Sequence, residues 1–79
     1  MEIKSTIGQR IKFLREQAAM SQKDLAYTAD LDRSYIASVE SGCRNISIVN
    51  IEKIATALNV TLKEFFNATE FDFTSGSRQ

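Results

Sequence analysis

The stretch QKDLAYTADLDRSYIASVE, residues 22–40, decides the fold of this chain. It consists of two short segments with apolar or small residues at helical spacing, separated by residues that favour a turn. The inward-facing positions are Leu25, Ala26 and Ala29 in the first segment and Ile36 and Val39 in the second. Ser41 and Gly42 then end the second segment. The pattern predicts two short helices that pack against each other across a tight turn.

Local capping signals mark the ends of these two helices. Ser21 is a favoured N-cap residue, and Asp24 places negative charge at the positive end of the helix dipole. Asp30 stands where the turn often needs a left-handed backbone, which aspartate tolerates better than most residues. Asp32 is the predicted cap of the second helix. Two helices joined in this way are typical of a helix-turn-helix, whose second helix lies in the major groove of DNA.

Further capping signals predict three more helices. Thr6 to Gln9 fits a capping box, which predicts a first helix over residues 6–18. Ser47 is the predicted cap of a fourth helix, and Thr61 to Glu64 forms a second capping box that opens a short fifth helix. We therefore predict an all-α fold of five helices.

Length and composition indicate one globular domain. The chain has 79 residues, of which 43% are apolar and 25% charged, with no proline. We expect residues 1–66 to form a DNA-binding and dimerisation domain and residues 67–79 to form a short, partly mobile tail. The formal net charge is zero, which argues against a basic tail that coats any polyanion. Local placement of cations decides DNA binding, so zero net charge does not exclude it.

The residue types needed for several kinds of chemistry are missing. The chain has no histidine and a single cysteine, Cys43, so neither a metal-ligand cluster nor a Cys-His or Ser-His-Asp set can be built. No glycine-rich phosphate loop is present. We therefore expect no enzymatic activity, no metal and no cofactor. The single cysteine and the absence of a signal-like or membrane-length apolar run predict a cytoplasmic protein with no membrane partner.

The motif residues resemble a known family. The match to the Cro/phage-repressor (lambda-repressor-like) class of helix-turn-helix proteins is carried by Gln22, Leu25-Ala26, Leu31, Ile36, Val39-Glu40 and Gly42. Within that class, LDRSYIASVESGCRNISI (residues 31–48) resembles the controller proteins of restriction–modification systems. The chain departs from many members at Asp30, where they have glycine.

The resemblance implies a homodimer that binds an inverted repeat in double-stranded DNA. It also implies control of the protein's own gene and of a restriction endonuclease gene, with RNA polymerase as a candidate further partner. A phage-type repressor or an antitoxin is the alternative within the class. A helical interaction module that does not bind DNA is the alternative from a different class.

The candidate DNA contacts gather at the starts of the two motif helices and after the second one. Arg33 opens the second helix, where its guanidinium can donate two hydrogen bonds to guanine O6 and N7. Gln22 opens the first motif helix, whose free backbone N–H groups form a natural phosphate-binding site. Tyr35 either contacts phosphate or a thymine methyl group or packs on the first motif helix. The full predicted set is Gln22, Lys23, Arg33, Ser34, Tyr35, Ser38, Arg44 and Asn45.

Two further groups of residues have predicted structural roles. The resemblance pairs Arg15 with Glu40 as a largely buried ion pair that orients the second motif helix without touching DNA. The apolar residues after position 45 exceed what one face of two short helices needs, so part of them is expected to form a two-fold interface. The predicted interface residues are Ile48, Val49, Asn50 and Phe66.

Overall fold

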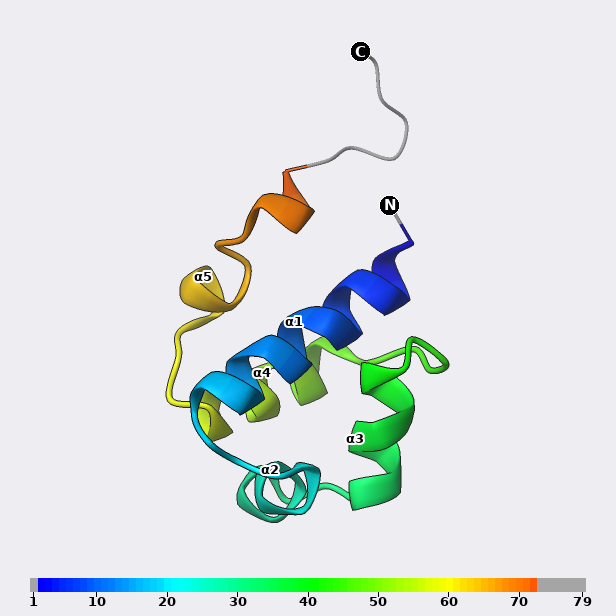
Figure 1. The fold of residues 1–79 in the computed structure, drawn as a ribbon, viewed down its shortest axis with the longest axis vertical. Coiled ribbons are helices and arrows are strands. Elements are labelled where there is room, and N and C mark those ends of the chain that lie inside the picture. The colour runs from blue at the N-terminus through cyan, green and yellow to red at the C-terminus, as the bar shows by residue number, and fades with distance from the viewer. Residues whose placement is uncertain (1, 73–79) are drawn as a thin grey trace.

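The computed structural model describes residues 2–72, and its regular structure in this range is entirely helical (Figure 1). The elements in chain order are α1 (Ile3–Gln17), α2 (Gln22–Ala29), α3 (Arg33–Glu40), α4 (Ile48–Ala57), α5 (Leu62–Phe65) and the 3-10 turn η1 (Thr69–Phe71). The prediction of an all-α fold with five helices is confirmed.

One core joins the five helices. α1 packs against α3, α2 packs against both α3 and α4, and α4 contacts α5. In Figure 1, α1 crosses the centre of the molecule, and α2 and α3 lie at its lower end. The largest fully buried side chains are Phe65, Ile11, Leu25, Ile36, Ile54 and Val39. They come from all five helices, so the position of the helix-turn-helix depends on every other element.

The start of α1 differs from the prediction. The helix begins at Ile3, and the N-cap is Glu2, whose carboxylate accepts a hydrogen bond from the Ser5 backbone N–H at 2.8 Å. Thr6 lies inside the helix and donates its hydroxyl proton to the Glu2 carbonyl oxygen. The predicted capping box of Thr6 and Gln9 is therefore wrong, because a carboxylate four residues earlier caps the helix first.

The motif itself follows the capping signals. Ser21 and Asp24 form a capping box at the start of α2, and Asp30 ends α2 in the left-handed conformation with φ 59° and ψ 47°. Asp32 occupies the N-cap position of α3, but its side chain makes no capping hydrogen bond. Gly42 follows α3 with φ +79°. The predicted bounds of the helix-turn-helix are confirmed. Asp32 occupies the predicted N-cap position, but its side chain does not cap the helix.

A close approach between α1 and α3 depends on Gly8. A Cβ atom built on Gly8 would lie 2.3 Å from the Val39 carbonyl oxygen and 2.7 Å from that of Glu40. Both distances are far below van der Waals contact, so only glycine lets the two backbones approach this closely.

The predicted caps at Ser47 and at Thr61 with Glu64 are both present. After α5 the described chain continues into η1, where the Phe71 ring packs edge-on against Phe66 with centroids 5.1 Å apart. The division at residue 66 stays a prediction, and residues 73–79 of the predicted tail lie outside the described residues.

Candidate DNA-binding surface

The start of α3 carries exposed polar residues. Arg33 and Ser34 are exposed, whereas Ile36 and Val39 on the opposite side of the helix are buried in the core. Ser38 is half-buried one turn further along. An arginine at the positive end of a helix is stabilised by an external anion rather than by its own helix. This end of α3 therefore presents a cation and a hydroxyl to a partner.

Two shallow hollows meet at the start of α3. A hollow of about 700 Å³ is lined by Arg15, Ser21, Gln22, Lys23 and Arg33, so three of the predicted DNA contacts lie around it. A second, of about 340 Å³, is lined by Asp30, Leu31, Asp32, Ser34, Tyr35 and Arg44. The two aspartates make this surface mixed in charge. Lys23, Arg33 and Arg44 nevertheless lie around the helix start, which is the local placement of cations that DNA binding by a chain of zero net charge requires.

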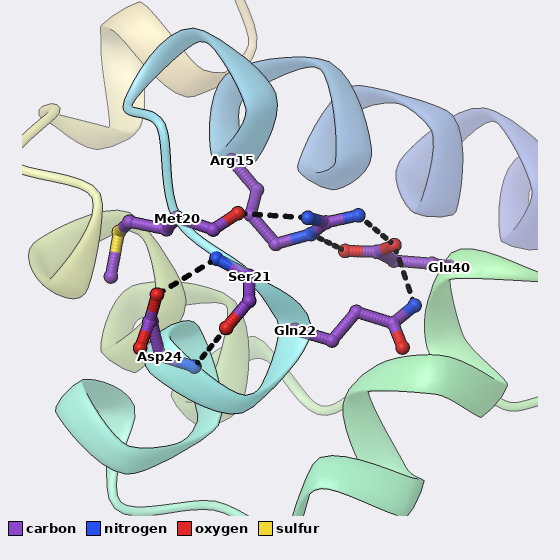
Figure 2. A network of polar contacts seen from close by, with 6 residues as sticks. All are labelled: Arg15, Met20, Ser21, Gln22, Asp24 and Glu40. Atoms are coloured by element: carbon purple, nitrogen blue, oxygen red, sulfur yellow. Dashed lines mark hydrogen bonds and ion pairs between the residues drawn. The ribbon is translucent and has the colours of Figure 1, made fainter.

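A buried charged network fixes the other end of α3 (Figure 2). Arg15 of α1 donates hydrogen bonds to both carboxylate oxygens of Glu40, at 2.7 Å from Nε and 3.0 Å from Nη2. Its remaining Nη1 donates to the Met20 carbonyl oxygen at 2.9 Å. Arg15 and Glu40 are only 8% and 9% exposed. The hydrogen bonds with Glu40 raise the pKa of Arg15 above its usual range, although burial opposes this.

Gln22 completes this network. Its side-chain Nε2 donates to Glu40 Oε1 at 3.0 Å, so the same carboxylate ties α1, the start of α2 and the end of α3 together. Sequence reasoning assigned Gln22 to a phosphate and did not foresee the bond to Glu40. The side chain is half-buried and lines the larger hollow, so its amide group lies between the network and that hollow.

Tyr35 is held between two other elements. Its hydroxyl accepts a hydrogen bond from Asn50 Nδ2 of α4 at 2.9 Å. The Arg44 guanidinium lies 4.9 Å from the centre of its ring, in cation–π geometry. Tyr35 is half-buried and packs against the core. The structure thus brings together Tyr35 and Arg44, which the sequence assigned to DNA contact, and Asn50, which it assigned to the dimer interface.

The predicted interface residues divide into two kinds. Ile48, Val49 and Phe66 are 77%, 59% and 41% exposed, so their apolar side chains remain accessible to a partner. Asn50 instead points toward Tyr35 and is half-buried. Phe66 lines a groove of about 380 Å³ formed with Ile3, Lys4, Ile7, Asn45, Ile46 and Ile51. Asn45 therefore lies beside this groove and does not line either hollow at the start of α3.

Arg10 has a role that sequence reasoning missed. Its guanidinium donates to the Phe65 carbonyl oxygen at 2.7 Å and to the Glu64 carbonyl oxygen at 2.9 Å. These carbonyl groups lie at the end of α5, where a cation also complements the helix dipole. Arg10 therefore holds α5 to α1 and is not a free cation for DNA. The partners lie more than fifty residues apart in sequence, and no local pattern links them.

Residues 2–72 also bear on two other kinds of function. No group of three or more His, Cys, Asp or Glu side chains there could hold a metal ion. None of the helices in this range is both long enough and apolar enough to cross a membrane.

Comparison with known proteins agrees with this geometry. A family model described as a helix-turn-helix domain matches residues 8–70. The chain belongs to the helix-turn-helix family. Control protein C.MunI from Mycoplasma sp is 46% identical to this helix-turn-helix protein over 70 residues, which cover 87% of this chain and 95% of C.MunI. The relative and the motif place the chain among the restriction–modification controller proteins.

Solved structures of controller proteins share the fold of this helix-turn-helix protein. C.AhdI from Aeromonas hydrophila has 48% sequence identity and a TM-score of 0.77, over 80% of this chain and 91% of that one. C.Esp1396I, solved as a tetramer with its natural 35 base-pair operator, has 36% identity and a TM-score of 0.82, over 89% of this chain and 95% of that one. The arrangement of helices is therefore one that a related protein uses while bound to operator DNA.

Proposed function

We propose that this helix-turn-helix protein is a homodimeric, sequence-specific transcription regulator that controls its own gene and a restriction endonuclease gene. The observation that carries the proposal is the arrangement of α3. Its last residue, Glu40, is fixed by a buried ion pair, while its first residues, Arg33 and Ser34, are exposed. The similarity to controller proteins, one of them in an operator complex, supports the same function.

In this proposal α3 enters the major groove with its first turn toward the bases. Arg33 donates two hydrogen bonds to a guanine, which is worth roughly 1–3 kcal/mol of discrimination against another base. Ser34 and Ser38 contact base edges or phosphate from the same helix. Gln22 and Lys23 contact phosphate at the start of α2.

The remaining contacts come from the residues around the end of α3. Arg44 adds a cation beside Tyr35, at the edge of the smaller hollow. Asn45, from the following loop, contacts phosphate in this proposal. Phosphate contacts of this kind set the register of the protein on DNA, and the base contacts set the sequence.

A second copy of the chain completes the DNA-binding unit. A dimer places two copies of α3 about one turn of DNA apart, ~34 Å, so the target is an inverted repeat. The exposed Ile48, Val49 and Phe66 side chains are the proposed interface, because burying them against an identical patch removes apolar surface from water. Asn50, the fourth predicted interface residue, donates a hydrogen bond to Tyr35 of α3.

Regulation in this proposal acts through binding alone and involves no catalysis. It takes place at DNA in the cytoplasm, with RNA polymerase as a candidate partner at the promoter. Whether the protein activates or represses depends on where its site lies relative to that promoter.

The test is selection of bound duplexes from a random DNA pool at near-physiological salt. We expect enrichment of an inverted repeat with half-sites about one turn apart. Arg33→Ala should weaken the enrichment and relax the preference at the guanine position, whereas Lys53→Ala on the exposed side of α4 should leave it intact. Binding without any enriched motif, lost at modest salt, would indicate non-specific phosphate contact only and favour a partner-binding module.

A further inference from the structure

The hydrogen bond between Asn50 and Tyr35 links α4 to the DNA-facing side of α3. Asn50 is itself fixed, because its backbone N–H donates to the capping Ser47 hydroxyl at 3.1 Å. Its side-chain Nδ2 then donates to the Tyr35 hydroxyl at 2.9 Å. On the ring of Tyr35, the Arg44 guanidinium lies 4.9 Å from the centroid. The phenol is therefore held at its hydroxyl and on its ring face by two separate elements.

The direction of the Asn50 bond determines what the hydroxyl can do next. A tyrosine hydroxyl has one proton to donate and lone pairs to accept with. When it accepts from Asn50, its own proton is left for another acceptor, and the accepted bond polarises the O–H group into a better donor. Tyr35, Ser34 and Arg44 line one part of the smaller open hollow, and Asp30, Leu31 and Asp32 line the rest, so Arg44 is its only cation. An acceptor that enters this hollow meets a neutral donor beside a cation.

A DNA phosphate is the acceptor whose chemistry fits this pair. Its oxygens accept hydrogen bonds and carry the charge that Arg44 complements. We propose that Asn50 is a positioning residue, which directs the Tyr35 hydroxyl proton toward a DNA phosphate without touching DNA itself. The inference rests on the proposed function, and it gives Asn50 a role other than the dimer interface that the sequence suggested.

A purely structural bond between α3 and α4 makes a different prediction. In that case loss of Asn50 or of the Tyr35 hydroxyl breaks the same bond, so each lowers stability or dimerisation, and DNA affinity falls only as far as folding or association does. If Asn50 acts through the hydroxyl, its loss has no further effect once the hydroxyl is gone. A double-mutant cycle on DNA affinity tests whether Asn50 acts through the hydroxyl. Unfolding and sedimentation of the same variants separate the two cases, because a positioning role lowers affinity while stability and dimerisation stay close to wild type.

The experiment uses the full chain and the duplex enriched from the random pool. Dissociation constants are measured at several salt concentrations for the wild type, Asn50→Ala, Tyr35→Phe and the double variant, with thermal unfolding and sedimentation as checks. We expect each single variant to bind about tenfold more weakly, as for loss of one hydrogen bond to a charged group. The double variant should bind no more weakly than Tyr35→Phe.

The salt dependence gives an independent readout. Neither Asn50 nor Tyr35 is charged, so their variants should keep the wild-type slope of log affinity against log salt. Arg44→Ala should reduce that slope by about 0.9, the value for one phosphate contact on duplex DNA. A changed slope in Asn50→Ala would contradict the proposal.

Several results would overturn the inference while leaving the proposed function standing. One is wild-type affinity in Tyr35→Phe, which removes only the hydroxyl and leaves the ring in place. Another is an Asn50→Ala effect of equal size in the presence and absence of the hydroxyl. If Asn50→Ala does not fold, Asn50→Ser and Tyr35→Phe complete the same cycle. If instead the wild type enriches no duplex at all, the proposed function itself fails.

Discussion

Gly8 of α1 faces the Val39 carbonyl of α3 so closely that a Cβ atom on Gly8 would lie 2.3 Å from that oxygen. Alanine normally stabilises a helix interior relative to glycine, by about 1 kcal/mol. Here the added methyl group would meet backbone, which cannot rotate away. We predict that Gly8→Ala lowers the free energy of unfolding by ~1–3 kcal/mol, as overpacking does. Denaturant unfolding measures this, and Gln9→Ala, at the neighbouring exposed position, should be close to neutral.

The Arg15–Glu40 pair gives a second prediction. Glu40→Ala leaves the Arg15 guanidinium buried without its carboxylate and also removes the acceptor of Gln22. We expect a loss of ~3 kcal/mol or more, as for other buried pairs that lose one partner. The matched control is Glu52→Ala on the exposed side of α4, which should change stability little. A thermal unfolding midpoint that barely moves in Glu40→Ala would mean that the pair contributes no more than a surface contact.

The capping box of α2 predicts how stability depends on pH. Hydrogen bonds from the backbone and side chain of Ser21 lower the pKa of Asp24 below its ordinary value of 3.8. The folded state therefore favours the ionised carboxylate, and the resulting stability is present above the ordinary pKa and is lost as pH falls below it. Asp24→Asn should be less stable than the wild type at pH 7 and should approach it toward pH 2. The same substitution at Asp32, which makes no capping hydrogen bond, should give a smaller difference at pH 7.

The exposed apolar residues at the start of α4 predict the behaviour of the dimer. Ile48→Glu and Val49→Glu should shift the protein toward monomers, because burying the new carboxylate in an interface is costly. Both residues are more than half exposed in the single chain, so the fold should remain intact. Sedimentation equilibrium measures the shift. Tyr27→Glu on α2, where the wild-type side chain is 88% exposed, should leave the association unchanged.

Local sequence signals predicted the elements well where donor and acceptor are near in sequence. The caps at Ser21 and Thr61 and the left-handed turn at Asp30 follow from spacings of three residues or from a single backbone preference. The start of α1 was wrong for a related reason. Glu2 and Thr6 are both capping residue types, and the pattern does not say which one the chain uses.

Contacts between residues that are distant in sequence could not be predicted from local spacing. The Arg10 bonds to the end of α5 and the Asn50 bond to Tyr35 join residues that only the packed helices bring together. Gln22 was assigned to an external phosphate because free N–H groups at a helix start favour an anion, and no local pattern indicates that Glu40 lies nearby. Arg15 and Glu40 were paired through family resemblance, and composition alone would have placed both at the surface.

The exposed start of α3 and its buried end have a consequence for how such proteins diverge. α3 has eight residues, so about 12 Å separates the Glu40 end from the Arg33 end. Substitutions at Arg33 or Ser34 touch solvent rather than the core, and they leave the charged network at Glu40 unchanged. A gene copy can therefore acquire a new DNA target through one or two codon changes while the protein keeps its thermal tolerance.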